Sequence, residues 1–306
     1  MNRSRKRVCL IVLAVLFLLS AIYLAVLHSS GSWLLSILQW TDYAWTPPAA
    51  FEGFHLAFLA ACVLISIGFA WLGMRIKAYQ CDTLVFGAGC LLFVLEVYKQ
   101  YYSFFVMNDR VYDFGFLPLQ LCSLPLYLFL LTPLLPEGAL KEAFYRFLAF
   151  FATMGGCLVM VYPAFYDRLS LCIHTMVWHT VMISIGVMIL FARGYGKSWR
   201  REMPSAVIVF IASVLLATLM NVLLRPLAYA SPNPLNLLYM SPYEKTYFVL
   251  IRDVQRTMGW LPSMLCYVLL FIFVGATLVF LVAYVIQRLR VRAWNFEKRG
   301  KKQENI

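Results

Sequence analysis

The chain has 306 residues and a net charge of +12, and its mean hydropathy is +0.77 because 62% of the residues are hydrophobic and only 13% are charged. A soluble domain has about a quarter charged residues, so this composition excludes a soluble globular protein and indicates an integral membrane protein. The basic residues are spread over several short loops rather than gathered on one domain, which disfavours nucleic-acid binding.

Eight apolar segments are each long enough to cross a bilayer, which needs about 20 mostly apolar residues. The first follows a basic N-terminus, as a signal peptide would. Its apolar run exceeds the roughly 7–15 residues of such a peptide, so we expect it to be retained as a membrane helix. We therefore predict an all-α, polytopic transmembrane helical bundle with spans at 8–28, 51–74, 83–107, 115–135, 144–163, 170–192, 204–225 and 262–287.

The distribution of Lys and Arg predicts the topology. With the N-terminus in the cytoplasm, 19 of the 26 basic residues fall on the cytoplasmic side and 6 on the other, and Lys99 lies within a span. This bias favours cytoplasmic N- and C-termini in a multi-pass protein of the cell membrane. The basic loops would then contact anionic headgroups, so membrane lipids are the expected partners.

We divide the chain into three parts. Residues 1–50 hold the first span and an external segment rich in Trp, a residue that prefers the headgroup level. Residues 51–287 form the transmembrane core, and residues 288–306 form a basic cytoplasmic tail. Within the core, the loop 226–261 contains an amphipathic run, and one interpretation is a lid over an outward-facing pocket.

The eight cysteines lie mostly inside predicted spans and show no CxxC spacing. They indicate neither a disulfide framework nor a zinc site. We expect no metal and no cofactor.

Four predicted spans carry polar side chains at a similar depth below the outer surface. At 1.5 Å per residue, Cys122, His179 and Glu96 lie roughly 10, 14 and 16 Å below it. Ionisable groups at such depth are costly unless they face the bundle interior or a wet cavity, so they are site candidates. The polar residues of this slab are Glu96, Lys99, Gln100, Cys122, His174, His179 and Asn221.

Each candidate also has a structural interpretation. Glu96 could pair with Lys99 and Gln100, at i+3 and i+4, only to fix packing. His179 could bond a backbone carbonyl, and a free cysteine such as Cys122 usually packs as a small hydrophobe. However, Pro118 and Pro125 flank Cys122, and they predict a bend that leaves backbone groups unpaired.

The segment 116–124 reads FLPLQLCSL, and it resembles the LPLHLCSL motif of the YwaF-type integral membrane proteins of bacteria, whose animal relative is a membrane acyltransferase of ether-phospholipid metabolism. The run TMGGC at 153–157, followed by Pro163, is similar to the Gly-rich fifth span of that family. The triplet WHT at 178–180 falls where the family has Thr-His-Gly, and Asn221 falls near a family asparagine. The resemblance covers about residues 50–285.

The resemblance implies an acyl-transfer site with Cys122 as nucleophile and His179 as its histidine, acting on a phospholipid acyl donor or acceptor. A thiolate attacks an ester carbonyl, and a neighbouring imidazole takes the thiol proton. The chain departs from the family motif at Gln120, where the family often has His. If that position supplied the base, His179 or His174 would have to replace it.

Three function classes remain open. The first is a lipid acyltransferase, or a lipid hydrolase that forms a thioester. The second is a small-molecule or ion transporter with Glu96 and Lys99 on its path, for which broken helices in two corresponding halves are expected. The third is a non-enzymatic lipid-binding scaffold in which the polar slab is structural.

Overall fold

The structure, a computed structural model, describes residues 3–28, 33–163 and 165–289. The predicted basic tail, 288–306, lies outside the described residues after its first two positions. The described chain is a bundle of helices, with one isolated β-bridge between Ala44 and Arg168. The labelled helices of more than three residues are α1 (Arg3–His28), α2 (Trp33–Trp40), α3 (Gly53–Gly73), α4 (Ala78–Tyr102), η1 (Ser103–Met107), α5 (Leu124–Leu131), α6 (Ala139–Phe147), η4 (Leu148–Ala152), α7 (Thr153–Val161), α8 (Leu169–Ala192), α9 (Trp199–Leu223), α10 (Val249–Met258), α11 (Trp260–Leu270) and η6 (Phe271–Ala276). The α-helical residues 277–289 continue the last of these.

Within the described residues, seven helical stretches are long and apolar enough to cross a membrane. Each matches one predicted span, although several begin a few residues earlier. For example, α9 begins at Trp199 rather than at 204, because the helix continues past the apolar run through the charged pair Arg200 and Arg201. The stretches are Ser4–His28, Gly53–Gly73, Ala78–Met107, Ala139–Val161, Leu169–Ala192, Trp199–Leu223 and Trp260–Leu289.

The predicted span at 115–135 is helical only in its second half. A short 3-10 turn, η2 (Phe114–Phe116), is followed by turns up to position 123, and the apolar helix runs only over Leu124–Leu134. These eleven residues make about 16 Å of helix, half the thickness of the hydrocarbon core. Pro118 explains the failure, because it lacks an amide hydrogen and disfavours a helical conformation in the residue before it.

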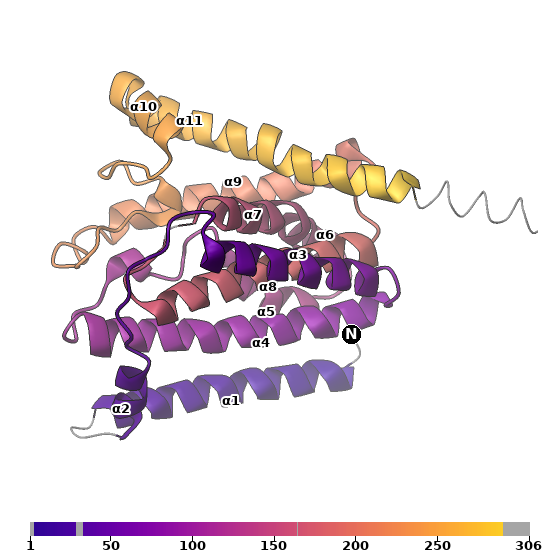
Figure 1. Cartoon of the computed structure of the whole chain (residues 1–306). Coiled ribbons are helices and arrows are strands. Elements are labelled where there is room, and N and C mark those ends of the chain that lie inside the picture. The colour runs from indigo at the N-terminus through magenta and orange to yellow at the C-terminus, as the bar shows by residue number, and fades with distance from the viewer. Residues whose placement is uncertain (1–2, 29–32, 164, 290–306) are drawn as a thin grey trace, which may run out of the picture.

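The segment from Phe116 to Lys141 nevertheless runs along α4 in the opposite direction. At one end Gln100 Nε2 donates to the Phe116 carbonyl oxygen at 2.7 Å, and at the other Lys141 pairs with Asp82 at 2.7 Å. The chain therefore crosses from one end of the bundle to the other over this segment, although only half of the segment is helical. As the predicted even number of crossings requires, both ends of the described chain lie at the same end of the bundle (Figure 1).

The core lies around α8 and the continuous helix formed by α6, η4 and α7. All five residues of the π turn η4 are buried, and Phe151 stacks on Phe210 of α9 with ring centroids 4.6 Å apart. A Cβ atom at Gly186 of α8 would collide with Thr153. The absence of a side chain at this position thus allows α8 and α7 to pack closely, as small residues do between membrane helices.

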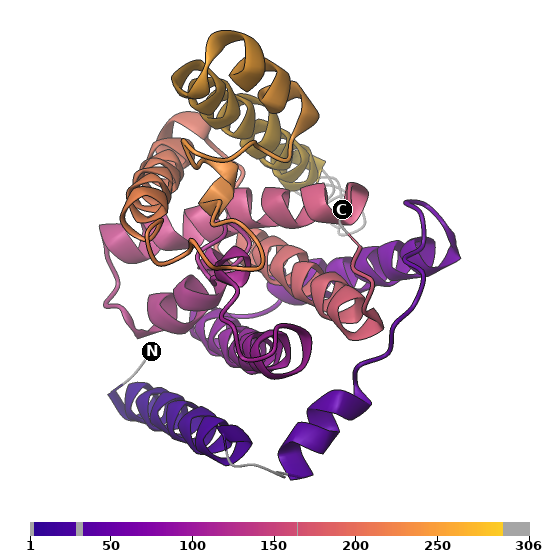
Figure 2. The same cartoon turned by 90° about the vertical axis from the view of Figure 1, so that its left-hand side faces the viewer.

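The first span lies at the edge of the bundle. Viewed from the end away from the chain termini, α1 is separate from the central helices and lies near α4 (Figure 2). Most of its side chains are exposed on the protein surface, and Tyr101 of α4 donates to the Ser20 carbonyl oxygen at 2.6 Å. In a membrane those apolar side chains face lipid.

A buried ionic network joins α4, α6 and the end of α8 at the end of the bundle that holds the termini. Asp82 accepts from Lys141 through Oδ2 at 2.7 Å, and from Arg193 and Tyr145 through Oδ1 at 2.6 Å each. Arg193 also donates to Glu142 at 2.8 Å. We refer to these residues as the ionic network.

The members of the network differ in exposure. The Lys141 side chain is fully buried, whereas its second partner, Glu137, is 65% exposed. The Lys141 ammonium at 2.6 Å holds the pKa of the Glu137 carboxyl below its usual value. A buried charge needs such partners because desolvation is costly.

Candidate functional site

The non-helical residues before α5 carry backbone groups that need partners inside the bundle. Irregular backbone at membrane depth is tolerated only where protein or a wet cavity satisfies it. Tyr127 donates its hydroxyl to the Pro118 carbonyl oxygen at 2.8 Å, and Trp178 donates its indole N–H to the Cys122 carbonyl oxygen at 2.8 Å. Together with Gln100, these side chains from α4, α5 and α8 hold the segment in place.

Cys122 lies immediately before the N-terminus of α5. Ser123 is the N-cap residue, and Pro125 occupies the second helical position, where a missing amide hydrogen costs nothing. The interruption of the fourth span thus places the sulfur at a helix end rather than on a helix face.

His179 has one hydrogen-bonded and one free ring nitrogen. Its Nδ1 lies 2.7 Å from the Thr175 carbonyl oxygen, and because a carbonyl only accepts, Nδ1 carries the proton. Nε2 is buried without a hydrogen-bond partner. A proton on it would leave a buried charged ring without an acceptor, so the neutral imidazole is favoured and Nε2 carries a lone pair.

His174 is held differently. Its Nε2 donates to the Leu95 carbonyl oxygen of α4 at 3.2 Å, and its ring stacks on Trp178 with centroids 5.4 Å apart. It thus links α8 to α4. His174 also lines the same cavity as His179, but its hydrogen bond to α4 indicates a structural role.

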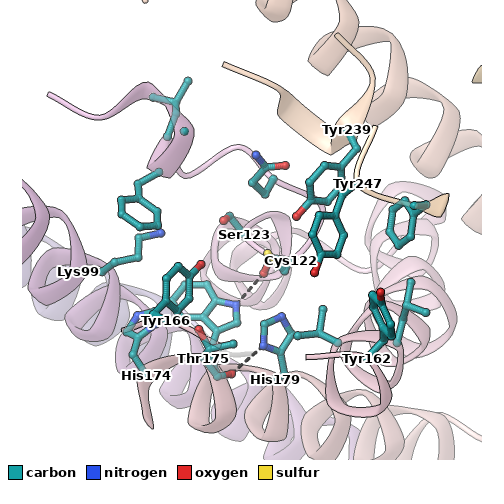
Figure 3. A pocket seen from close by; sticks show the side chains of 18 residues that line it. Lys99, Cys122, Ser123, Tyr162, Tyr166, His174, Thr175, His179, Tyr239 and Tyr247 are labelled. Carbon is teal, nitrogen blue, oxygen red and sulfur yellow. Dashed lines mark hydrogen bonds between the residues drawn. The ribbon is translucent and has the colours of Figure 1, made fainter. Parts of the chain in front are cut away.

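Cys122 and His179 line one cavity of about 200 Å³ (Figure 3). It lies between α7, α8, the loop that follows α9, and the non-helical residues 117–123, which we call the cysteine segment. Among the described residues, no hydrogen bond joins the Cys122 sulfur to either imidazole. The loop after α9, which includes the run predicted to be a lid, supplies three aromatic side chains to the cavity wall: Tyr239, Tyr247 and Phe248. The cavity is lined by Lys99, Gly115, Phe116, Leu117, Gln120, Cys122, Ser123, Leu158, Val159, Tyr162, Tyr166, His174, Thr175, Trp178, His179, Tyr239, Tyr247 and Phe248.

Gln120 and Asn221 hold this loop against the cysteine segment. The Gln120 side chain accepts from the Leu238 amide at 2.8 Å and donates to the Asn236 carbonyl oxygen at 3.2 Å. Asn221 accepts from the Leu237 amide at 2.8 Å and donates to the Leu237 carbonyl oxygen at 3.1 Å. Gln120 therefore acts as a clamp between the two segments.

The clamped turn is strained. Leu238 and Tyr239 have positive φ angles of 53° and 56°, a conformation that is costly for residues other than glycine. The side chain of Tyr239 faces the cavity, and burial raises the pKa of Tyr239 to about 12. Its hydroxyl is thus a neutral donor near neutral pH.

Glu96, Lys99 and Gln100 form a local cluster on α4. Lys99 pairs with Glu96 at 2.9 Å, as the i+3 spacing predicts, and Gln100 donates to the same carboxylate oxygen at 2.6 Å. The second oxygen of Glu96 is buried without a hydrogen-bond partner. Only Lys99 of the three lines the cavity.

The structure thus separates the predicted site residues into two groups. Cys122, His179, His174, Lys99 and Gln120 line the cavity. Glu96, Gln100 and Asn221 of the predicted polar slab are not among the lining residues. Glu96 bonds Lys99 and Gln100 within α4, Gln100 also holds the carbonyl oxygen of Phe116, and Asn221 holds the backbone of Leu237.

Sequence reasoning missed the tyrosines of the cavity. Tyr162 and Tyr166 follow α7, and Tyr239 and Tyr247 come from the loop after α9. They lie near the ends of apolar runs, as interfacial aromatic residues typically do. The sequence therefore provided no reason to assign them to a cavity. As for a metal, no group of three His, Cys, Asp or Glu within the described ranges could hold one.

Comparison with known proteins identifies the family. A model of the TMEM164 family matches residues 50–287, most of the chain. The protein belongs to the TMEM164 family. It is a multi-pass integral membrane protein, as the match and the seven apolar helices show. No curated protein and no solved structure matches the chain.

Proposed function

We propose that this TMEM164-family protein transfers or hydrolyses lipid acyl chains through Cys122 and His179. The observation that carries the proposal is the unpartnered Nε2 of His179, a residue that lines the same cavity as Cys122. A general base needs an unprotonated nitrogen within reach of the proton it takes, and hydrogen bonds of this kind are often long before substrate binds. The resemblance to a cysteine-dependent acyltransferase supports the same roles.

The reaction proceeds in two steps. The Cys122 thiol loses its proton to His179 Nε2, and the sulfur attacks the ester carbonyl; the C–O bond breaks, and the proton passes to the leaving oxygen. The product is a thioester on Cys122. In the second step a lipid hydroxyl or water gives its proton to Nε2 and attacks the thioester, and the proton returns to the sulfur as the acyl group leaves.

The cavity supplies donors for the charge that develops on the carbonyl oxygen. The Lys99 ammonium lies on one side of Cys122 in Figure 3, and Tyr239 and Tyr247 lie on the side of the loop. Donors fixed in a site with little water stabilise such an oxyanion more than water does. The phenol of Tyr239 is suited to this role because it stays protonated.

The setting of the cavity supports a lipid substrate. The cavity lies toward the end of the bundle opposite the chain termini, where helix α8 begins and α7 ends. With cytoplasmic termini in the cell membrane, as the basic residues predict, this end belongs to the outer leaflet. The ion pair of Glu96 and Lys99 leaves no uncompensated charge on α4, which favours acyl chemistry over an ion path.

Covalent labelling tests the proposal. We expect a short acyl electrophile, an alkyne-tagged butanoyl chloromethyl ketone, to label the full-length protein in nanodiscs at Cys122, with loss of chloride and formation of a C–S bond. Cys122→Ser should remove the label. Cys157→Ser and Cys266→Ser are matched controls, because both thiols are at least partly exposed and neither lines the cavity.

Two outcomes would contradict the proposal. One is equal labelling of all three variants, which would make Cys122 one more packed thiol and favour the scaffold function. The other is labelling of Cys122 at the same rate after His179→Ala. In addition, wild-type protein given a phospholipid with a labelled acyl chain should accumulate a hydroxylamine-sensitive thioester, which Cys122→Ser should not form.

A further inference from the structure

A second, apolar hollow lies beside the cavity. It has a volume of about 330 Å³ and runs between α7, the start of α10 and the helix α11 with its π turn η6. We call it the acyl groove. Its lining is almost wholly hydrophobic and consists of Met154, Leu158, Phe248, Val249, Leu250, Ile251, Tyr267, Leu270, Phe271, Val274 and Gly275.

The acyl groove borders the cavity, because Leu158 and Phe248 line both spaces. From these residues the groove extends one turn along α7 to Met154 and along α11 from Tyr267 to Gly275, a distance of roughly 12 Å at 1.5 Å per residue. A hydrocarbon chain that passes Leu158 and Phe248 would thus have apolar walls as far as Met154 and Gly275.

The far end of the groove is formed by one contact. A Cβ atom built on Gly275 would lie 2.6–2.7 Å from the Met154 side chain. Met154 therefore lies directly against the glycine, and its flexible side chain would have to move if position 275 carried a side chain. The residues at these two positions decide how much space remains at this end.

We propose that the acyl groove holds the hydrocarbon chain of the ester whose carbonyl is at Cys122, and that Met154 and Gly275 set the chain length it accepts. This inference rests on the proposed function. The remaining cavity walls carry Lys99 and several tyrosines, which suit the polar part of a lipid. The hydrocarbon chain is best placed where the walls become apolar, at Leu158 and Phe248, because the burial of each methylene group is favourable.

A larger apolar groove provides a contrast. It lies between α3, α4 and α8, has a volume of about 450 Å³, and shares no lining residue with the cavity. Gly87 lies on its wall, and a Cβ atom there would meet nothing within 4 Å. A leucine at position 87 thus fills a groove of similar character that has no connection to Cys122.

The experiment compares chain lengths in both grooves. Full-length wild type, Gly275→Leu, Met154→Phe and Gly87→Leu are labelled in nanodiscs with butanoyl and palmitoyl chloromethyl ketones. We expect Gly275→Leu and Met154→Phe to lower the palmitoyl-to-butanoyl ratio of Cys122 labelling about tenfold, the equivalent of two methylenes removed from apolar contact. Gly87→Leu should keep the wild-type ratio. Butanoyl labelling of each variant shows that its site is folded.

The outcomes separate the two proposals. If butanoyl ketone does not label Cys122 in wild type, the proposed function fails. If it does, but Gly275→Leu and Met154→Phe keep the wild-type ratio, or Gly87→Leu changes it equally, only the acyl groove fails. If Gly275→Leu does not fold, the two Met154 variants decide the test. Met154→Phe should lower the palmitoyl-to-butanoyl ratio, and Met154→Ala, which enlarges the groove, should raise it.

Discussion

At the end of the bundle that holds the chain termini, Asp82 meets Lys141, Arg193 and Tyr145 at 2.6–2.7 Å. At the other end, the Nε2 atom of His179 is equally buried and has no partner. A buried polar atom without a hydrogen bond costs about 1–3 kcal/mol. Unpaired buried atoms also occur at Arg193 Nε and Glu96 Oε2, but of these three residues only His179 lines the cavity with Cys122. We infer that the paired charges of Asp82 serve stability, whereas the His179 nitrogen serves the proposed site.

The largest expected effect concerns the unpaired nitrogen. His179→Ala should lower the rate of Cys122 labelling about 10²- to 10⁴-fold, the usual contribution of a general base. His174→Phe keeps a ring against Trp178 and should reduce labelling far less. Labelling rates at several probe concentrations measure both effects. A larger loss in His174→Phe than in His179→Ala would reverse the two roles.

The next effect concerns the ionic network. Lys141→Met removes one partner of a buried ion pair and leaves Asp82 with less compensation, so it should destabilise the protein by about 3–5 kcal/mol. Thermal unfolding in detergent should show this as a large fall in the midpoint. His179→Ala should leave the midpoint close to that of wild type. If both variants unfolded at the same temperature, the contrast between the two ends would be lost.

A smaller effect is expected at the clamp of the loop. Asn221→Ala removes two hydrogen bonds to the buried backbone of Leu237, each worth about 0.5–1.5 kcal/mol. The loop that carries Tyr239 and Tyr247 should loosen, and Cys122 labelling should fall without disappearing. Hydrogen exchange over residues 235–248 should rise. Unchanged exchange there would show that Asn221 does not hold the loop.

The smallest effect is expected at the exposed edge of the ionic network. Glu137 pairs with Lys141 at 2.6 Å, but its side chain is 65% exposed, so solvent screens the pair. Glu137→Gln should change the unfolding free energy by only about 0.2–1 kcal/mol. The same thermal measurement serves, with Lys141→Met as reference. A loss as large as that of Lys141→Met would contradict the view that burial decides the contribution.

Composition and periodicity predicted the helical fold because apolar length is a local property. Seven spans could be located in this way. The fourth could not, because hydropathy does not record whether an apolar segment is helical, and Pro118 signalled only a bend rather than the loss of the helix. The depth argument brought Cys122, His179 and Glu96 to one level, and the structure places the first two around one cavity but not Glu96.

The partners of the polar residues could not be predicted, because they depend on contacts between segments that are distant in the chain. Asn221 lies at the predicted depth, yet it bonds the backbone of Leu237 rather than lining the cavity. The ionic network was missed for the same reason, since Asp82 and Arg193 are separated by more than a hundred residues. The tautomer of His179 became visible only with the position of the Thr175 carbonyl oxygen.

The half-helical fourth crossing has a consequence for biosynthesis. The apolar helix Leu124–Leu134 is about half as long as a helix that spans the bilayer, so it does not complete the crossing alone. The backbone before them finds partners in α8, made later, and Gln120 then anchors the loop near Leu238, made later still. We infer that the cysteine segment reaches its final position only after the ribosome has passed this loop. A nascent chain would thus carry the Cys122 thiol without the histidine and tyrosines around it, and the proposed site would assemble among the last parts of the molecule.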